Sequence, residues 1–330
     1  MQNEHKRSIL VEKSIIFPKL INKKSNRFQI AGRKWYKNWQ LYALLVPSLV
    51  YLAVFAYAPM YGVIIAFKDY NSFDGIFGSQ WVGFENFRRF FDNYLFWDLI
   101  KNTLSISFFS IIVNTPLPII LALLINEVRN KFFRSSVQMI SYAPYFVSVV
   151  VAVGMTFSFL NPERGVINEM IKFFGGQSIA FMESPSLFLP VYITSGVWQG
   201  LGWWSIIYVG TLANVDPSLH EAATIDGAGR FKRMWHINIP AIIPIATIML
   251  ILSIGSLLSV GFEKVYLMQT QLNLPASTVI PTYVYEVSLK SNLKDFSFGT
   301  AVGLFNTFIN LILLISANVI SKKVDGESLW

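Results

Sequence analysis

Six long apolar stretches separated by short polar segments dominate this 330-residue sequence. A helix needs roughly twenty apolar residues to cross a hydrocarbon core about 30 Å thick, and each stretch is long enough to do so. Within lipid, only helices and closed barrels satisfy every backbone hydrogen bond, and runs of this length favour helices. The sequence therefore predicts an all-α membrane protein with six spans. The expected spans are residues 41–67, 103–125, 136–160, 187–213, 241–260 and 300–320.

The composition agrees with a multispan protein. Hydrophobic residues make up 53% of the chain, charged residues only 14%, and the mean hydropathy is +0.47. Such values are typical of membrane proteins rather than soluble domains. The chain has no cysteine, which excludes disulfides, cysteine-based zinc sites and thiol catalysis. No internal repeat or second domain is visible.

The distribution of Lys and Arg predicts the orientation of the spans. Alternate polar segments, at residues 1–40, 126–135, 214–240 and 321–330, hold eighteen Lys and Arg residues. The other segments, at residues 68–102, 161–186 and 261–299, hold nine. Cytoplasmic loops carry the excess of positive charge. Both termini and the segment 214–240 are therefore expected on the cytoplasmic side.

The ends of the chain complete the expected domain organisation. Residues 1–40 form a basic cytoplasmic arm, expected to be retained, partly disordered and able to touch anionic lipid rather than nucleic acid. Residues 41–322 form the six-span domain, and residues 323–330 form a cytoplasmic tail.

The polar segment between the fourth and fifth spans predicts two short helices, at residues 219–225 and 228–237. Asp216 is placed to cap the first helix, and Gly227 to end it in a left-handed turn. The second helix is expected to end at Pro240. On physical grounds the segment is either an idle ordered loop or a compact knob that contacts a partner.

The residues of this loop resemble a specific motif. Glu221-Ala222-Ala223, then Gly227 after three residues, then Ile237 after nine and Pro240 after two more follow the pattern EAA-x3-G-x9-I-x-L-P. That pattern is the EAA loop of binding-protein-dependent ABC importer permeases, and Ile239 in place of Leu is the one departure. In that family the loop docks into a cleft of an ATPase subunit. The resemblance implies an ATPase-coupling role for Glu221, Ala222, Ala223, Asp226, Gly227, Ile237 and Pro240.

Other stretches resemble the carbohydrate branch of the same permeases. They are YGVIIAFKDY (61–70), WVGFENF (81–87), NTPLPIILALLINEV (114–128), SYAPYFVSVVV (141–151), WQGLGWWSIIYVGTL (198–212) and GFEKVYLM (261–268). The resemblance implies the six-span type I importer fold in a bacterial cell (inner) membrane. It also implies a second permease subunit as a heterodimer partner, two ATPase subunits and an extracytoplasmic solute-binding protein. ATP and magnesium would then bind to the partner ATPases, and this chain would bind no cofactor.

The sequence offers no catalytic machinery of its own. The phosphate-binding pattern GxxxxGK[ST] is absent, and the three histidines, His5, His220 and His236, lack metal-ligand spacing. The predicted spans contain no Asp, Glu, Lys or Arg, so an ion-coupled transporter would have no obvious charge carrier. The chain is therefore expected to be a transport subunit and not an enzyme.

Neutral polar and aromatic residues within the spans are candidates for the substrate pathway. Sugars are bound by amides that reach their hydroxyls and by aromatic rings that cover their apolar faces. The alternative is that the Trp residues anchor the helices at the lipid interface and the Asn residues join helices. The candidates are Asn114, Trp198, Gln199, Trp203, Tyr208, Asn306 and Asn310.

These observations predict the transmembrane subunit of an ATP-driven importer of a carbohydrate, with an oligosaccharide favoured. Within the same family, a permease for amino acids or peptides shares the EAA loop. An ion-coupled secondary transporter and a structural or signalling membrane subunit are the alternatives outside it.

Overall fold

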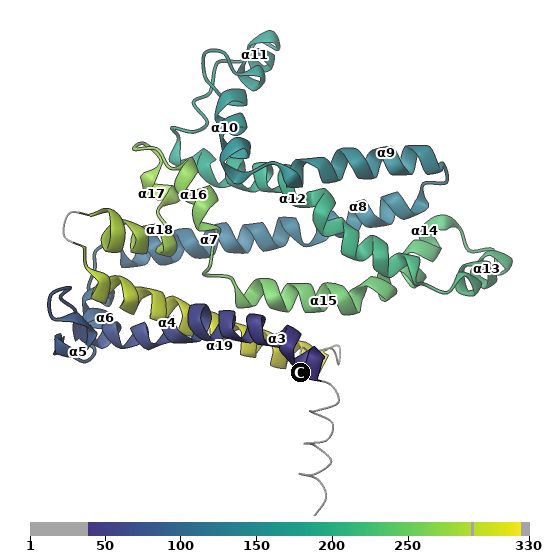
Figure 1. Cartoon of the computed structure of the whole chain (residues 1–330). Coiled ribbons are helices and arrows are strands. Elements are labelled where there is room, and N and C mark those ends of the chain that lie inside the picture. The colour runs from purple at the N-terminus through teal and green to yellow at the C-terminus, as the bar shows by residue number, and fades with distance from the viewer. Residues whose placement is uncertain (1–38, 292–293, 325–330) are drawn as a thin grey trace, which may run out of the picture. The chain divides into compact units, whose positions relative to one another are not determined.

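The structure, a computed structural model, describes residues 39–291 and 294–324. The chain divides into two compact units, residues 1–62 and 63–330. Apart from residues 39 and 40, the predicted basic arm lies outside the described residues, as do residues 325–330 of the predicted tail. The predicted all-α class is confirmed, because helices form almost all of the regular structure (Figure 1).

The first unit holds the start of one long helical segment. Helix α3 (Trp39–Leu52) continues through the π-helical η1 (Ala53–Tyr57) into α4 (Ala58–Met60). Pro47 lies inside α3 and Pro59 inside α4. The π turn directly before Pro59 accommodates a residue that has no N–H to donate.

Five long helices run alongside one another in the second unit (Figure 1). They are α7 (Phe96–Asn114), α8 (Pro116–Glu127), α12 (Pro185–Ala213), α15 (Ile239–Gly255) and α19 (Phe296–Val324). Helix α12 packs against α7, α8 and α15, and α15 packs against α19. Helix α12 is therefore the central element of this unit.

Shorter elements connect these helices. The only strands among the described residues, β1 (Lys68–Asp69) and β2 (Gln80–Trp81), pair antiparallel, with Lys68 opposite Trp81. The other elements are η2 (Tyr61–Phe67), α5 (Gly75–Gly78), α6 (Glu85–Phe91), α9 (Lys131–Tyr142), η3 (Ala143–Phe146), α10 (Val149–Phe159), α11 (Val166–Phe173), α13 (Pro217–Ile225), α14 (Arg230–Arg233), η4 (Met234–Asn238), α16 (Phe262–Met268), α17 (Leu274–Ser277), α18 (Ile280–Tyr285) and η5 (Glu286–Lys290).

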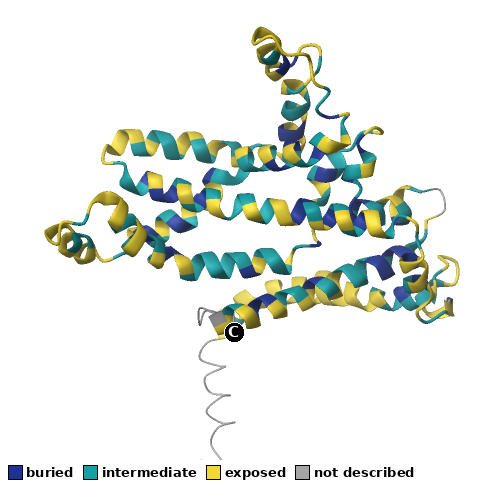
Figure 2. Cartoon of the chain, turned by 180° about the vertical axis from the view of Figure 1, so that it is seen from behind, coloured by how far each residue is buried: buried dark blue, intermediate teal, exposed yellow. Residues whose placement is uncertain are grey.

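Three apolar clusters form the core of the second unit. One surrounds Phe188, Val265 and Met268, a second surrounds Phe90 and Leu99, and a third joins α8, α12 and α15. Buried residues are sparse along each long helix, and most positions are intermediate or exposed (Figure 2). Exposed apolar side chains of this number are expected for helices whose outer faces contact lipid or partner helices.

The prediction of six spans is confirmed only in part. Within the described residues, four helices are long and apolar enough to cross a membrane, namely Trp39–Phe67, Phe96–Glu127, Arg230–Gly255 and Phe296–Lys323. The predicted span 136–160 is bent, because Lys131–Phe146 and Val149–Phe159 meet at an angle of 102°, as in a broken span or a re-entrant loop. Counted as one broken span, this pair raises the number to five. Helix α12 has the required length, but its Gly, Ser, Gln and Trp residues lower its hydropathy.

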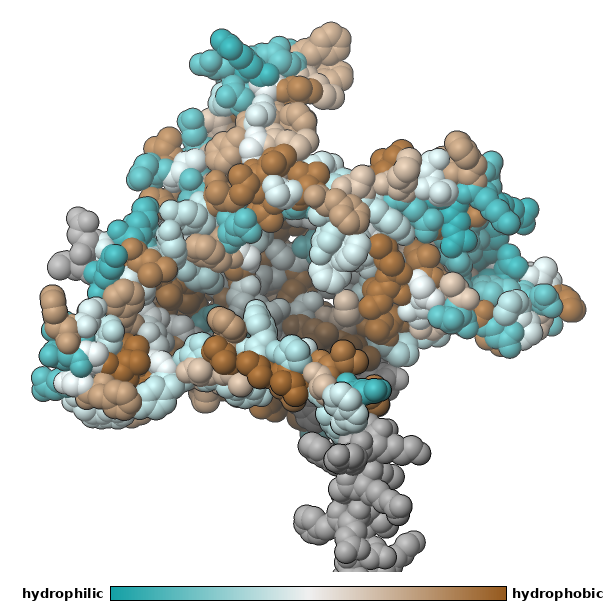
Figure 3. Space-filling view, in the orientation of Figure 1, coloured by the Kyte–Doolittle hydropathy of each residue, from teal (hydrophilic) through white to brown (hydrophobic). Residues whose placement is uncertain are grey.

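The two ends of the long helices in the second unit differ in the segments that they carry. The turn between α8 and α9 and the pair α13–α14 lie at one end, whereas α6, α17 and α18 lie at the other (Figure 1). Hydrophilic residues gather over the end that carries α13 and α14 (Figure 3). The segments 126–135 and 214–240, both rich in Lys and Arg, thus share one end.

Candidate functional site

The predicted loop between α12 and α15 begins with a capped helix. The Asp216 side chain accepts a hydrogen bond of 2.9 Å from the Ser218 N–H, and Pro217 occupies the first helical position. This hydrogen bond lowers the pKa of the Asp216 carboxyl, because it favours the ionised form. The predicted cap of the first short helix, α13, is confirmed.

Gly227 ends α13 in the predicted left-handed turn, with φ of +77°. The Ala228 N–H donates to the Ala223 carbonyl at 2.8 Å, and the Gly227 N–H donates to the Thr224 carbonyl at 3.1 Å. These two bonds define a Schellman motif. The loop is also closed by a side chain, since Arg233 Nη1 donates to Thr224 Oγ1 at 2.6 Å.

The prediction that the second helix ends at Pro240 is wrong. Helix α14 passes into the π-helical η4 and then directly into α15, so that Arg230–Gly255 is one long helix. Pro240 lies at the start of α15, after a π turn in which the Ile239 N–H donates to the Met234 carbonyl. The wider turn admits the proline ring without ending the helix. The loop is consequently joined rigidly to a membrane span.

Most residues of the EAA-like motif are on the surface. Glu221, Ala222, Asp226, Gly227 and Pro240 are exposed, and Ala223 and Ile237 are partly buried. Helix α13 contributes no buried residue. A shallow hollow borders Glu221 and is lined by His220, Glu221, Thr224, Ile225 and Arg233. A helix with both faces exposed is available for contact with another subunit.

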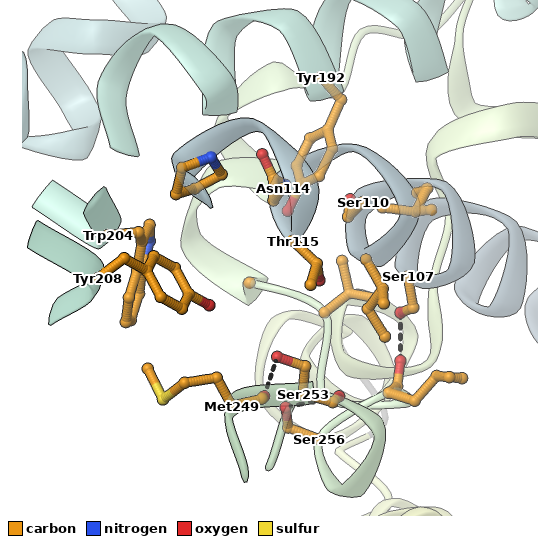
Figure 4. A pocket seen from close by; sticks show the side chains of 16 residues that line it. Ser107, Ser110, Asn114, Thr115, Tyr192, Trp204, Tyr208, Met249, Ser253 and Ser256 are labelled. Carbon is orange, nitrogen blue, oxygen red and sulfur yellow. Dashed lines mark hydrogen bonds between the residues drawn. The ribbon is translucent and has the colours of Figure 1, made fainter. Parts of the chain in front are cut away.

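Two adjoining cavities lie between the long helices of the second unit. Their volumes are about 270 Å³ and about 580 Å³. Both are lined by Ser110, Asn114, Tyr192 and Trp204. Figure 4 shows the smaller cavity, into which α7, α12 and α15 contribute side chains. The larger cavity extends toward the break between η3 and α10.

The smaller cavity is lined by hydroxyl groups and rings. Ser253 donates to the Met249 carbonyl at 2.8 Å, and Ser107 donates to the Leu257 carbonyl (Figure 4). The Tyr208 and Trp204 rings stand opposite these serines in the same view. Such a lining can satisfy hydroxyl groups and cover apolar faces of a ligand.

The larger cavity contains a lysine. Lys264 Nζ on α16 donates to the Tyr192 carbonyl at 3.0 Å and lies 4.7 Å from the centre of the Tyr192 ring. Burial lowers the pKa of the Lys264 ammonium to about 8, because removal from water penalises the charged form. Every lining residue of the two cavities is described by the structure, and Lys264 is the only Asp, Glu, Lys, Arg or His among them.

Three of the predicted substrate-pathway residues line these cavities. Asn114 borders both, Tyr208 borders the smaller one, and Gln199 borders the larger one. Gln199 Nε2 also donates to the Val147 carbonyl at 2.9 Å, and this bond holds the break before α10. The structure thus places these two amides and one phenol at the cavities, and their contact with a substrate stays a prediction.

The other four candidates lie elsewhere. Trp198 is 44% exposed, and Trp203 stacks on Tyr145 with ring centres 4.3 Å apart. Neither Trp lines the two cavities. Asn306 borders a separate cavity of about 330 Å³. Asn310 is buried, accepts a hydrogen bond from the Leu258 N–H and donates to Ser259 Oγ, both at 2.9 Å.

The sequence did not predict all of the residues that line the two adjoining cavities. Trp204 lies in the stretch 198–212 that resembles carbohydrate permeases and is not among the candidates, although it borders both cavities. Ser110, Tyr192 and Lys264 were also not candidates. Lys264 carried a usable signal, because it is a charged residue just beyond a span end. Trp203 and Trp204 differ by about 100° around the helix, and the sequence alone does not fix which of them faces inward.

Comparison with known proteins identifies the family. Residues 114–326 match the binding-protein-dependent transport system inner membrane component family, and this chain belongs to that family. The polygalacturonan/rhamnogalacturonan transport system permease protein YteP of Bacillus subtilis (strain 168) is 44% identical over 290 residues, which are 88% of this chain and 90% of YteP.

Solved structures agree with the sequence comparison. A chain of a bacterial ABC transporter involved in the import of the acidic polysaccharide alginate superposes with a TM-score of 0.82 at 35% identity, covering 89% of this chain and 99% of that chain. A second structure, the alginate ABC transporter in complex with an alginate pentasaccharide-bound periplasmic protein, gives a TM-score of 0.83 at 35% identity, with 90% and 99% covered.

Family membership establishes the class of the chain. It is a multi-pass permease subunit of an ABC importer in the cell membrane, and not an enzyme. In such importers ATP hydrolysis belongs to separate subunits.

Proposed function

We propose that this chain moves an oligosaccharide across the membrane through the two adjoining cavities. The observation that carries the proposal is their shared lining, in which the Asn114 amide, the Ser110 hydroxyl and the Tyr192 and Trp204 rings border both cavities. Amides and hydroxyls bind sugar hydroxyls, and rings cover sugar faces. The polysaccharides after which YteP and the alginate transporter are named support a carbohydrate cargo.

The proposed importer contains further chains. A second, related permease subunit pairs with this one, and two ATPase subunits bind the EAA-like loops. An extracytoplasmic binding protein delivers the cargo, as the family description and the alginate complex suggest. ATP and magnesium belong to the ATPase subunits in this assembly.

The proposed orientation has both termini and residues 214–240 in the cytoplasm. The support is the excess of Lys and Arg in the segments that would lie inside. The complete path would use six crossings, with α12 as one crossing and the bent pair α9–α10 as another.

The proposed coupling acts through α13. Its exposed Glu221 and Ala222 would enter the ATPase cleft, while Gly227 shapes the turn back to α14. Because Arg230–Gly255 is one helix, a displacement of the loop would tilt the α15 wall of the smaller cavity. Alternating access requires two conformations of the subunit, here with different tilts of α15. ATP and the cargo must differ in their affinity for these two conformations.

The proposal predicts that Glu221→Lys leaves the complex assembled but uncouples it. We expect ATP hydrolysis stimulated by the loaded binding protein, and uptake with it, to fall about ten-fold or more. The reversed charge would stand at the centre of the proposed contact. Both rates can be measured with the complete complex in proteoliposomes supplied with oligogalacturonates, oligoalginates or neutral oligosaccharides.

The matched control is Glu163→Lys, the same charge reversal at an exposed residue between α10 and α11. It should leave both rates within about two-fold of the wild type. Full activity of Glu221→Lys would refute the coupling role. Uptake of amino acids or peptides, with no uptake of any oligosaccharide, would refute the proposed cargo.

A further inference from the structure

Lys264 is a cation at the wall of the larger cavity. Its Nζ lies over the Tyr192 ring and donates to the Tyr192 carbonyl, which places the ammonium between α16 and α12. An ammonium carries three N–H donors. Among the described residues it has this one hydrogen-bond acceptor, so two donors remain for another partner.

No carboxylate neutralises Lys264 within the described part of the chain. The ion pairs found there join Arg88 to Asp92, Arg89 to Asp295, Lys172 to Glu169, and Lys290 to Glu286. Glu263, the neighbour of Lys264 on α16, is exposed and makes no ion pair with it. A partly buried cation without a counter-charge is costly, and such a group at the wall of a cavity is a candidate for binding an anionic ligand.

We propose that Lys264 binds a carboxylate of the cargo, so that the transported oligosaccharide is an acidic one built from uronate-type sugars. This inference rests on the proposed import of an oligosaccharide and narrows its substrate class. It assigns the charge recognition to one residue of this chain.

The surroundings of Lys264 fit an acidic sugar. The two unused N–H donors can form charge-assisted hydrogen bonds to a carboxylate, which are about twice as strong as neutral ones. Asn114, Ser148 and Gln199 line the same cavity and can meet ring hydroxyls, while Trp204 can cover a sugar face.

The alternative is that Lys264 only fastens α16 to α12 through the Tyr192 carbonyl. Lys264→Gln separates the two roles, because Gln can donate to that carbonyl but carries no charge. Lys264→Arg keeps both the donor and the charge. Lys290→Gln is the matched control, since it removes an exposed cation outside both cavities.

The experiment uses the complete complex with its binding protein in proteoliposomes. Uptake of oligogalacturonate and oligoalginate is compared with uptake of their methyl-esterified or carboxyl-reduced counterparts, below saturation. We expect Lys264→Gln to lower uptake of the acidic chains about ten-fold or more and to change uptake of the neutral chains by less than two-fold. Lys264→Arg and Lys290→Gln should keep at least half of the wild-type uptake of the acidic chains.

The outcomes separate this inference from the proposed function. Equal loss of acidic and neutral uptake in Lys264→Gln, or wild-type uptake of acidic chains by that variant, overturns the role of Lys264. Failure of both Lys264 variants to assemble overturns it as well, because it reveals a structural role. Wild-type uptake restricted to neutral oligosaccharides overturns the acidic cargo alone, whereas no uptake of any oligosaccharide by the wild type refutes the proposed function.

Discussion

Burial lowers the pKa of the Lys264 ammonium from the ordinary 10.5 to about 8. The protonated form therefore predominates at pH 7 and is lost as the pH rises through 8 toward 9. A carboxylate is attracted only to the protonated form of Lys264. Uptake of acidic oligosaccharides should therefore decrease as the pH rises.

The pH prediction is a decline in uptake of oligogalacturonate by the wild-type complex between pH 7 and pH 9, measured far below saturation. Lys264→Arg should show a flatter profile, since arginine stays protonated over this range. Titratable groups on the packed elements are Tyr192 and Tyr208 on α12, Tyr283 and Tyr285 on α18, and Glu263 and Tyr266 on α16 itself, while α10 has none. Identical profiles for the two complexes would assign the decline to another group.

At the scale of residues, local signals were predictable and the facing of side chains was not. Asp216 and Gly227 act through bonds to residues within a few positions, so their roles as cap and turn could be predicted from sequence. Asn310 instead accepts a hydrogen bond from the Leu258 N–H and donates one to the Ser259 hydroxyl, 52 and 51 residues away. No sequence pattern predicts the irregular backbone at Leu258 and Ser259, after the end of α15. The Asn310 amide was therefore expected to be free for a substrate.

The packing of α12 against α9 depends on one glycine. A Cβ at Gly202 would overlap the Ser141 carbonyl and lie 2.8 Å from the Tyr142 nitrogen, both of which belong to the main chain of α9. Backbone atoms cannot move aside as a flexible side chain does. Close helix approach at small residues is a general feature of membrane helices.

Gly202→Ala is therefore expected to destabilise the second unit by about 1–3 kcal/mol, the usual cost of overpacking. Gly210→Ala on the same helix is the control, because nothing lies within 4 Å of a Cβ at that position. Alanine there should be neutral or stabilising by up to about 1 kcal/mol, since glycine is a poor helix former. Thermal unfolding of the purified complex in detergent measures both, and equal midpoints for the two variants would contradict the close contact.

At the scale of elements, hydropathy predicted where helices occur better than where they bend. The stretch 136–160 is apolar enough for a straight span, yet the chain turns by 102° at Val147–Ser148. Ser148 caps α10 by accepting from the Val151 N–H, and Gln199 on α12 holds the Val147 carbonyl. The first of these contacts is local, but the second requires a helix about fifty residues further along the chain. The prediction at Pro240 is wrong in the opposite direction, since a helix end was expected there. The π turn before Pro240 lets the helix continue.

On the scale of the whole molecule, the arrangement of the second unit supplies a test of orientation. Its long helices carry the loop 214–240 at one end and the segment between β1 and α5 at the other (Figure 1). Phe73 is 97% exposed in that segment, and Ile225 is 86% exposed at the end of α13. Because the chain has no cysteine, a single introduced thiol reports on its own position.

We expect a membrane-impermeant maleimide to label Phe73→Cys in intact cells and to leave Ile225→Cys unlabelled until the membrane is opened. The reason is the placement of the loop beside the other Lys- and Arg-rich segment, which the positive-inside bias assigns to the cytoplasm. The wild-type chain, which offers no thiol, gives the background. In inverted vesicles stripped of the ATPase, Ile225→Cys should become reactive, and added ATPase should protect it, because α13 is the proposed contact. Labelling of Ile225→Cys in intact cells would reverse the orientation and remove the loop from the side where ATP is hydrolysed.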